Sequence, residues 1–208
     1  MKTKRILLLV LMVDSIFAFS QKEEKTFGYK GFIGGMFIHA GYVESKQFEF
    51  TDKLNNKYVE HLNGLTAGIG GHVKVFLSDH FRVGTEGYLS KHSYENKSNI
   101  SITWWGILLD YYTQIGRFKP FVGNTIGRGE CTHIKIFHPI ENDYIADETV
   151  SVRKYYFMNT IPFVGVEYVI TERIHLIFKT DYMFNISNPQ NDFVTGPRFY
   201  IGFSFKNK

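Results

Sequence analysis

The sequence has 208 residues, a formal net charge of +4 and a pI of about 9.0. Half of that excess lies in the first twenty residues, because removing Lys2, Lys4, Arg5 and Asp14 lowers the net charge to +2. No cluster of Lys and Arg forms a phosphate-binding stripe, so nucleic acid is excluded as an expected partner. Cys131 is the single cysteine, which excludes an internal disulfide.

Residues 1–20 have the layout of a secretory signal peptide. A basic start precedes an apolar run over 6–13, and the small residues Ala18 and Ser20 precede Gln21. The run is too short to span a bilayer as a helix, and no later window resembles a transmembrane helix. We therefore expect an exported protein with a signal peptide over 1–20 and one domain over 21–208.

The rest of the chain is dominated by a two-residue period, which is typical of strands. It predicts eight strands, over 27–42, 63–77, 81–94, 99–114, 120–136, 153–169, 174–185 and 196–206. Each reaches the roughly 9–11 residues that a tilted strand needs to cross a bilayer. In the fifth strand Gly123, Gly127 and Gly129 leave a thin apolar face, and we expect a β-bulge there.

The connections between these segments alternate in length. Short turns at 78–80, 116–119 and 171–173 separate longer polar connections at 43–62, 95–98, 137–152 and 186–195. Outer-membrane barrels have this alternation, with short turns on the periplasmic side and longer loops outside. An even number of strands would place both termini on the periplasmic side.

Each strand has an apolar and a polar face. In the last strand Phe199, Ile201, Phe203 and Phe205 oppose Arg198, Tyr200, Gly202 and Ser204. A charge facing lipid at mid-membrane costs about 2–4 kcal/mol, so the polar face is expected to line the lumen. The predicted lumen network is Lys30, His72, Lys74, Arg82, Glu86, Asp110, Arg128, Glu167, Lys179, Asp181 and Arg198. Both signs are present, so we expect ion pairs that fill the narrow interior of an eight-stranded barrel.

These patterns together predict an all-β fold, an eight-stranded antiparallel up-and-down transmembrane β-barrel. The mean hydropathy of −0.16 and the 17% aromatic content suit a barrel in which every second residue faces lipid. The alternative is a soluble β-sandwich or lipocalin-like barrel with the apolar face inside. Strands of eleven or more residues count against it, since strands of globular sheets usually have five or six.

The leader ending at 17–21, the eight amphipathic strands and the aromatic-alternating closing segment 196–205 support a family resemblance. The chain resembles the small outer-membrane β-barrel proteins of Gram-negative bacteria, and within them the outer membrane protein β-barrel domain group common in Bacteroidetes. The resemblance implies location in the outer membrane, with outer-membrane lipid and the barrel-assembly machinery as partners. It also implies that Phe203 and Phe205 form the assembly signal.

The expected function is that of a non-enzymatic barrel with a structural role or with surface binding through the loops 43–62 and 137–152. We predict no catalytic residues, no cofactor and no metal site. One alternative is a narrow pore for small polar solutes. A second is a lipid A-modifying enzyme that uses Ser90 and His92 with Glu86, because a serine nucleophile needs a histidine base and an orienting acid.

Overall fold

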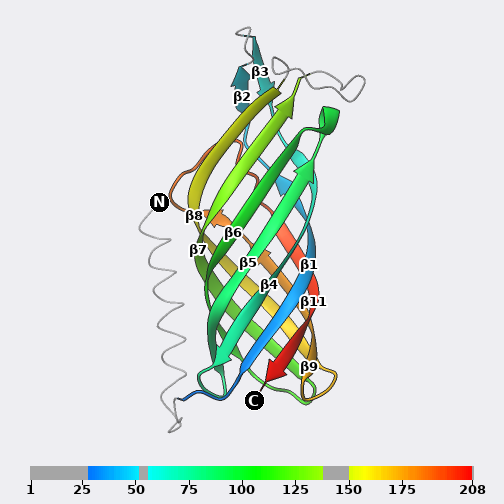
Figure 1. Ribbon diagram of the computed structural model, residues 1–208, viewed down its shortest axis with the longest axis vertical. Coiled ribbons are helices and arrows are strands. Elements are labelled where there is room, and N and C mark those ends of the chain that lie inside the picture. The colour runs from blue at the N-terminus through cyan, green and yellow to red at the C-terminus, as the bar shows by residue number, and fades with distance from the viewer. Residues whose placement is uncertain (1–27, 52–55, 138–149, 208) are drawn as a thin grey trace.

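The computed structural model describes residues 28–51, 56–137 and 150–207 (Figure 1). The predicted signal peptide lies outside these residues. Eight strands form a closed antiparallel barrel, which confirms the predicted fold class. They are β1 (Phe32–Glu44), β4 (Asn63–Phe76), β5 (Phe81–Ser93), β6 (Asn99–Tyr112), β7 (Phe118–Ile136), β8 (Val150–Val169), β9 (Ile174–Tyr182) and β11 (Pro197–Asn207).

Three short strands and one helical turn accompany the barrel. Strands β2 (Phe48–Thr51) and β3 (Lys57–Glu60) form a separate hairpin in the first long connection. Strand β10 (Phe184–Asn185) pairs with β8, and a 3₁₀ turn covers Glu95–Lys97. No helix within the described residues is long and apolar enough to cross a membrane.

The barrel closes where β1 pairs with β4 on one side and with β11 on the other. Gly31 accepts a backbone hydrogen bond from Phe76, and the paired positions can be followed from there through every strand. The series is Arg82, Asp110, Gly123, Phe163, Asp181, Arg198 and Gly41. The series starts at Gly31, directly before β1, and returns to β1 at Gly41, ten residues later. This stagger means that the strands are tilted relative to the barrel axis.

Two predictions about strand geometry were wrong. The first strand begins at Phe32 rather than at 27, which leaves Lys30 ahead of the barrel wall. The fifth strand, β7, has no bulge, because its pairing with β6 and β8 is unbroken. Its glycines instead make room for rings of β8: a Cβ added at Gly123 or Gly129 would collide with Phe163 or Phe157.

The outer face of the barrel is an apolar belt. Large apolar side chains that alternate with buried lumen residues are exposed all around it, for example Ile38, Ile69 and Ile107. Aromatic residues lie at both ends of the belt. Phe118 and Phe205 mark the end with the short turns, whereas Tyr42, Trp105, Tyr156, Tyr182 and Phe184 mark the end with the long connections. Strands β7 and β8 continue beyond the other strands toward the β2–β3 hairpin (Figure 1).

Candidate functional site

The lumen is the candidate functional site, because side chains from all eight strands meet there. Nine of the eleven predicted lumen residues lie inside the barrel, and each is at most 5% exposed. They are His72, Lys74, Arg82, Glu86, Asp110, Glu167, Lys179, Asp181 and Arg198. Lys30 and Arg128 lie elsewhere. Eight of these nine residues form two groups at different depths, whereas His72 belongs to neither and lies with its Nε2 3.2 Å from Ser204 Oγ. An apolar layer that the sequence did not predict closes the lumen above them.

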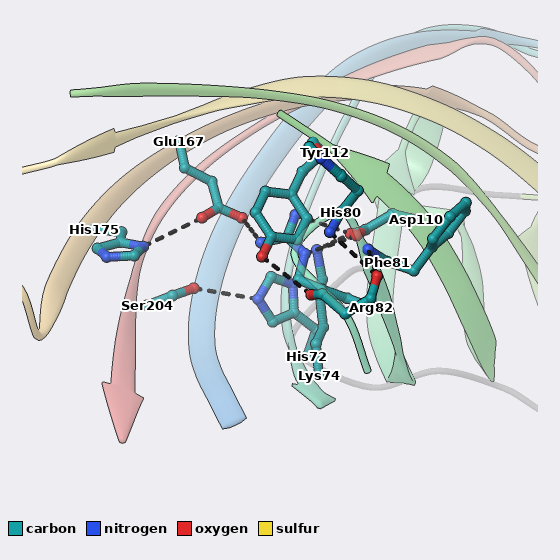
Figure 2. Close-up of polar contacts among 11 residues, drawn as sticks. His72, Lys74, His80, Phe81, Arg82, Asp110, Tyr112, Glu167, His175 and Ser204 are labelled. Carbon is teal, nitrogen blue, oxygen red and sulfur yellow. Dashed lines mark hydrogen bonds and ion pairs between the residues drawn. The ribbon is translucent and has the colours of Figure 1, made fainter. Parts of the chain in front are cut away.

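The first group, which we call the basal network, consists of Lys74, Arg82, Asp110 and Glu167 (Figure 2). The Arg82 guanidinium binds both carboxylate oxygens of Asp110, with Nε–Oδ1 at 2.7 Å and Nη2–Oδ2 at 3.1 Å. Its Nη1 donates to Glu167, and Lys74 Nζ lies 2.8 Å from Asp110 Oδ2. Two cations therefore face two carboxylates, with no net charge left over.

Strand register and aromatic packing position the basal network. Arg82 on β5 lies directly opposite Asp110 on β6, so the pair follows from the register. The Arg82 guanidinium carbon lies 4.6 Å from the Tyr112 ring centroid and 5.5 Å from that of Phe121. These rings exclude water, and a buried ion pair is tolerated in such a place only when its hydrogen bonds are satisfied. His175 completes the network through its Nδ1, 3.2 Å from Glu167 Oε2 (Figure 2).

The second group, the middle network, consists of Glu86, Lys179, Asp181 and Arg198. Lys179 Nζ lies 2.8 Å from Glu86 Oε2 and 3.7 Å from Asp181 Oδ2. Arg198 Nε donates to Asp181 Oδ1 at 2.8 Å. The Lys179 ammonium also lies 4.5 Å from the Tyr200 ring centroid. This group is also neutral overall, and outside both groups Lys119 on β7 adds a buried lysine that the sequence analysis did not predict for the lumen.

The third layer, the upper plug, is apolar. It consists of Ile102, Trp104, Phe157, Phe193 and Val194, none more than 6% exposed. Phe193 and Val194 belong to the last long connection, which folds inward, and the Phe193 ring packs edge-on against Phe157 with centroids 4.8 Å apart. The prediction of an outer loop over 186–195 left no place for this layer. The adjacent apolar residues Phe193 and Val194 were the signal that could have revealed it.

A hydrogen-bonded chain at His133 holds that connection in place. Tyr94 Oη lies 2.6 Å from His133 Nε2, and His133 Nδ1 lies 3.3 Å from Asp192 Oδ2. Burial raises the pKa of Tyr94, so its hydroxyl stays protonated. The Asp192 side chain on the other side of the ring is fully buried.

The β2–β3 hairpin packs on the same histidine. The rings of Phe48 and Phe50 lie 5.5 Å and 4.8 Å from the His133 ring. The connection 43–62 therefore folds over the mouth of the barrel. Of the other predicted binding loop, 137–152, residues 138–149 lie outside the described part of the chain.

The residues of the enzymatic alternative do not form a hydrogen-bonded triad. Ser90 Oγ lies 2.9 Å from Thr66 Oγ1, and His92 Nδ1 bonds the Leu65 carbonyl oxygen at 2.8 Å. Glu86 is engaged by Lys179. Ser90 and His92 border a cavity of about 10 Å³, which has room for about one water molecule. Within the described residues no group of three or more His, Cys, Asp or Glu side chains could hold a metal ion.

Two predicted lumen residues lie outside the lumen. Lys30 precedes β1 and forms an exposed ion pair with Asp79, with 2.8 Å between Nζ and Oδ1. Arg128 faces outward, because Thr125 and Cys131 on the same strand are fully buried and fix the alternation. Its guanidinium carbon lies 5.0 Å from the exposed Trp105 ring. The flanking residues, Gly127 and Gly129, have no side chains, so the sequence pattern did not indicate which face of this strand is apolar.

Phe203 and Phe205 lie on the outer face of β11, at 50% and 60% exposure. They alternate there with Gly202 and Ser204, which face the lumen. Their role as an assembly signal stays a prediction.

No protein-family model matches the sequence, and no curated protein matches it. Several solved structures share its architecture. Neisserial surface protein A is 14% identical and has a TM-score of 0.55, over 86% of this chain and 99% of that one. The outer membrane protein OprG from Pseudomonas aeruginosa is 14% identical with a TM-score of 0.50, over 88% and 98%. The chain thus has the fold of the small eight-stranded outer-membrane β-barrels.

Proposed function

We propose that this protein is a closed, non-enzymatic β-barrel of the bacterial outer membrane that acts as a structural element and binds partners through its outer end. The observation that carries this proposal is the filled lumen. The basal network, the middle network and the upper plug follow one another along the barrel axis, and each is buried.

The energetics of the lumen favour a closed barrel over the pore alternative. A solute could pass only if it separated buried ion pairs such as Arg82–Asp110 or Lys179–Glu86. Leaving one member of such a pair without its partner costs about 3–5 kcal/mol. The solute would also have to displace the connection that Asp192 and Phe193 anchor in the mouth. Within each of the two networks the positive and negative charges balance.

The outer surface supports placement in a membrane. Its apolar belt is flanked by aromatic residues at both ends, as in membrane-spanning barrels. Beyond the belt, β7, β8 and the β2–β3 hairpin form the part of the molecule that a partner outside the cell would meet. Rigid strands and a packed hairpin there can present a fixed binding surface.

Single-channel conductance in planar bilayers tests the proposal. The refolded protein, checked by faster migration of the unboiled sample on a denaturing gel, is expected to give no steady conductance. The double variant D192A/F193G removes two of the side chains that anchor the inward-folded connection and serves as the comparison. Steady, uniform openings of the unaltered protein would contradict the proposal and favour the narrow pore.

A further inference from the structure

The outer face of the barrel is chemically uneven. On β1, β4, β9 and β11 no outward-facing residue among those described is Lys or Arg. On β5, β7 and β8 three are: Lys91, Arg128 and Lys154, all exposed. Together with Trp105, Glu130 and Tyr156 they form what we call the basic patch.

Strand register brings the members of the basic patch together. Arg128 lies opposite Trp105 on one neighbouring strand, and Glu130 lies opposite Tyr156 on the other. The next row across the sheet runs from Lys91 through Ser101 and Thr132 to Lys154, each paired with the next. Four adjacent strands thus present three cations and two hydroxyls in two rows, and these rows lie four residues apart on β7, about 13 Å along the strand.

The patch lies at the outer edge of the apolar belt. Arg128 is ten residues beyond Phe118, which marks the opposite edge on the same strand. At about 3.3 Å per residue and a tilt of about 40°, this corresponds to about 25 Å along the axis, the height of a barrel's apolar band. Trp105 and Tyr156, exposed by 53% and 67%, belong to the aromatic residues that mark this depth.

The positive charge of the patch is only partly neutralised. Lys154 Nζ lies 2.9 Å from Glu130 Oε1. Among the described residues, Arg128 contacts the Trp105 ring, whose centroid lies 5.0 Å from its guanidinium carbon, and it contacts no carboxylate. Three cations and one carboxylate leave a surplus of two positive charges at the level of lipid headgroups.

We infer that the basic patch binds the phosphate group of a phosphorylated lipid in the outer leaflet. Guanidinium presents a planar pair of donors that matches a phosphate, and the lysine ammonium groups add charge beside it. Trp105 and Tyr156 pack against the part of the lipid between headgroup and acyl chains. The inference rests on the proposed membrane placement but is independent of whether the lumen is closed.

Native mass spectrometry of the whole barrel released from detergent micelles tests this inference. The probes are phosphorylated lipid A, the same lipid after removal of its phosphates, and phosphatidylcholine. The unaltered protein is expected to retain phosphorylated lipid A in preference to the other two. The variant R128Q/K154Q is expected to bind it about tenfold more weakly, because it loses charge-assisted hydrogen bonds.

Two further variants sharpen the result. R117Q/R173Q removes two exposed arginines from the short turns at the other end of the barrel and is expected to leave binding unchanged. Glu130→Gln removes the carboxylate that competes for Lys154 and is expected to strengthen binding about threefold. All variants are first checked for faster unboiled migration, so that loss of the fold is recognised separately.

Several outcomes would overturn the inference. Equal retention of phosphorylated and dephosphorylated lipid A would remove phosphate as the recognised group. Equal weakening by R128Q/K154Q and R117Q/R173Q would show general charge attraction rather than a site. Competition by millimolar inorganic phosphate as strong as by the lipid would exclude a lipid as the specific occupant. By contrast, a conducting barrel that still prefers phosphorylated lipid would contradict only the closed lumen of the proposed function and would support this site.

Discussion

The two ends of the lumen are closed by different chemistry. Near the short turns the basal network fills the barrel with paired charges, all contributed by strands. Near the long connections the upper plug fills it with rings and aliphatic groups, partly contributed by a connection that folds inward. The first arrangement depends on strand register, and the second depends on where a loop packs. A substitution in the basal network should therefore destabilise the whole barrel, whereas a substitution in the upper plug should act locally.

The largest effect is expected for Arg82→Met in the basal network. The change leaves Asp110 with Lys74 alone and Glu167 with His175 alone, in a site without access to water. We expect the free energy of unfolding to fall by about 3–5 kcal/mol. Urea titration of the protein folded into lipid vesicles measures it.

The matched control is Arg82→Lys, which keeps the charge but loses the bidentate contact. It should lower the free energy of unfolding by less than Arg82→Met does. The double variant R82M/D110N should recover part of the loss, because the two residues are coupled. An unchanged stability of Arg82→Met would show that the basal network does not hold the two sides of the barrel together.

A smaller effect is expected for Phe193→Ala in the upper plug. Removing a buried phenylalanine ring usually costs about 3–5 kcal/mol. Here we expect about 2 kcal/mol, because the connection 186–196 can detach from the mouth without opening the barrel. Hydrogen exchange of that connection should accelerate while β5 and β6 keep their protection. Uniform acceleration across all strands would mean that the two ends are not independent.

A still smaller effect is expected for Asp192→Asn, which weakens the hydrogen bond from His133 without creating a cavity. A hydrogen bond to a charged group contributes about 1.5–3 kcal/mol, and the amide retains part of it, so we expect about 1 kcal/mol. Exchange of the same connection reports the change. No acceleration there would show that the other contacts, such as the Phe193 packing and the backbone hydrogen bonds of Asn191 and Thr195, hold the connection without this one.

The smallest effect is expected for Lys30→Ala, outside both regions. Its ion pair with Asp79 is exposed, with 37% and 68% of the two side chains accessible. Exposed pairs contribute about 0–1 kcal/mol, and the same urea titration should show a change within that range. A loss as large as that of Arg82→Met would mean that this pair contributes far more than an exposed ion pair.

A feature of this molecule could be predicted where it follows from the strand pattern, and could not be predicted where it depends on how the connections pack. The eight strands and nine lumen residues follow from the two-residue period, since a one-residue slip would turn charges such as Lys74 toward lipid. The two-residue period wrongly placed Arg128 in the lumen, because the glycines on both sides of it have no side chain that marks a polar or an apolar face. It could not reveal the upper plug or the contacts of His133, because three connections distant in sequence meet there.

The pairing of β1 with β11 has a consequence for how the molecule forms. Ile38 pairs with Ile201, so the ring is closed by residues from opposite ends of the sequence. Contacts of such long range are slow to form, because the loop-closure entropy is lost before the pairing compensates for it. Until β11 is in place, β1 and β9 are both edge strands with unpaired backbone groups, open to pairing with other chains. The last eleven residues of the barrel therefore decide whether the chain ends as a closed monomer or as an aggregate.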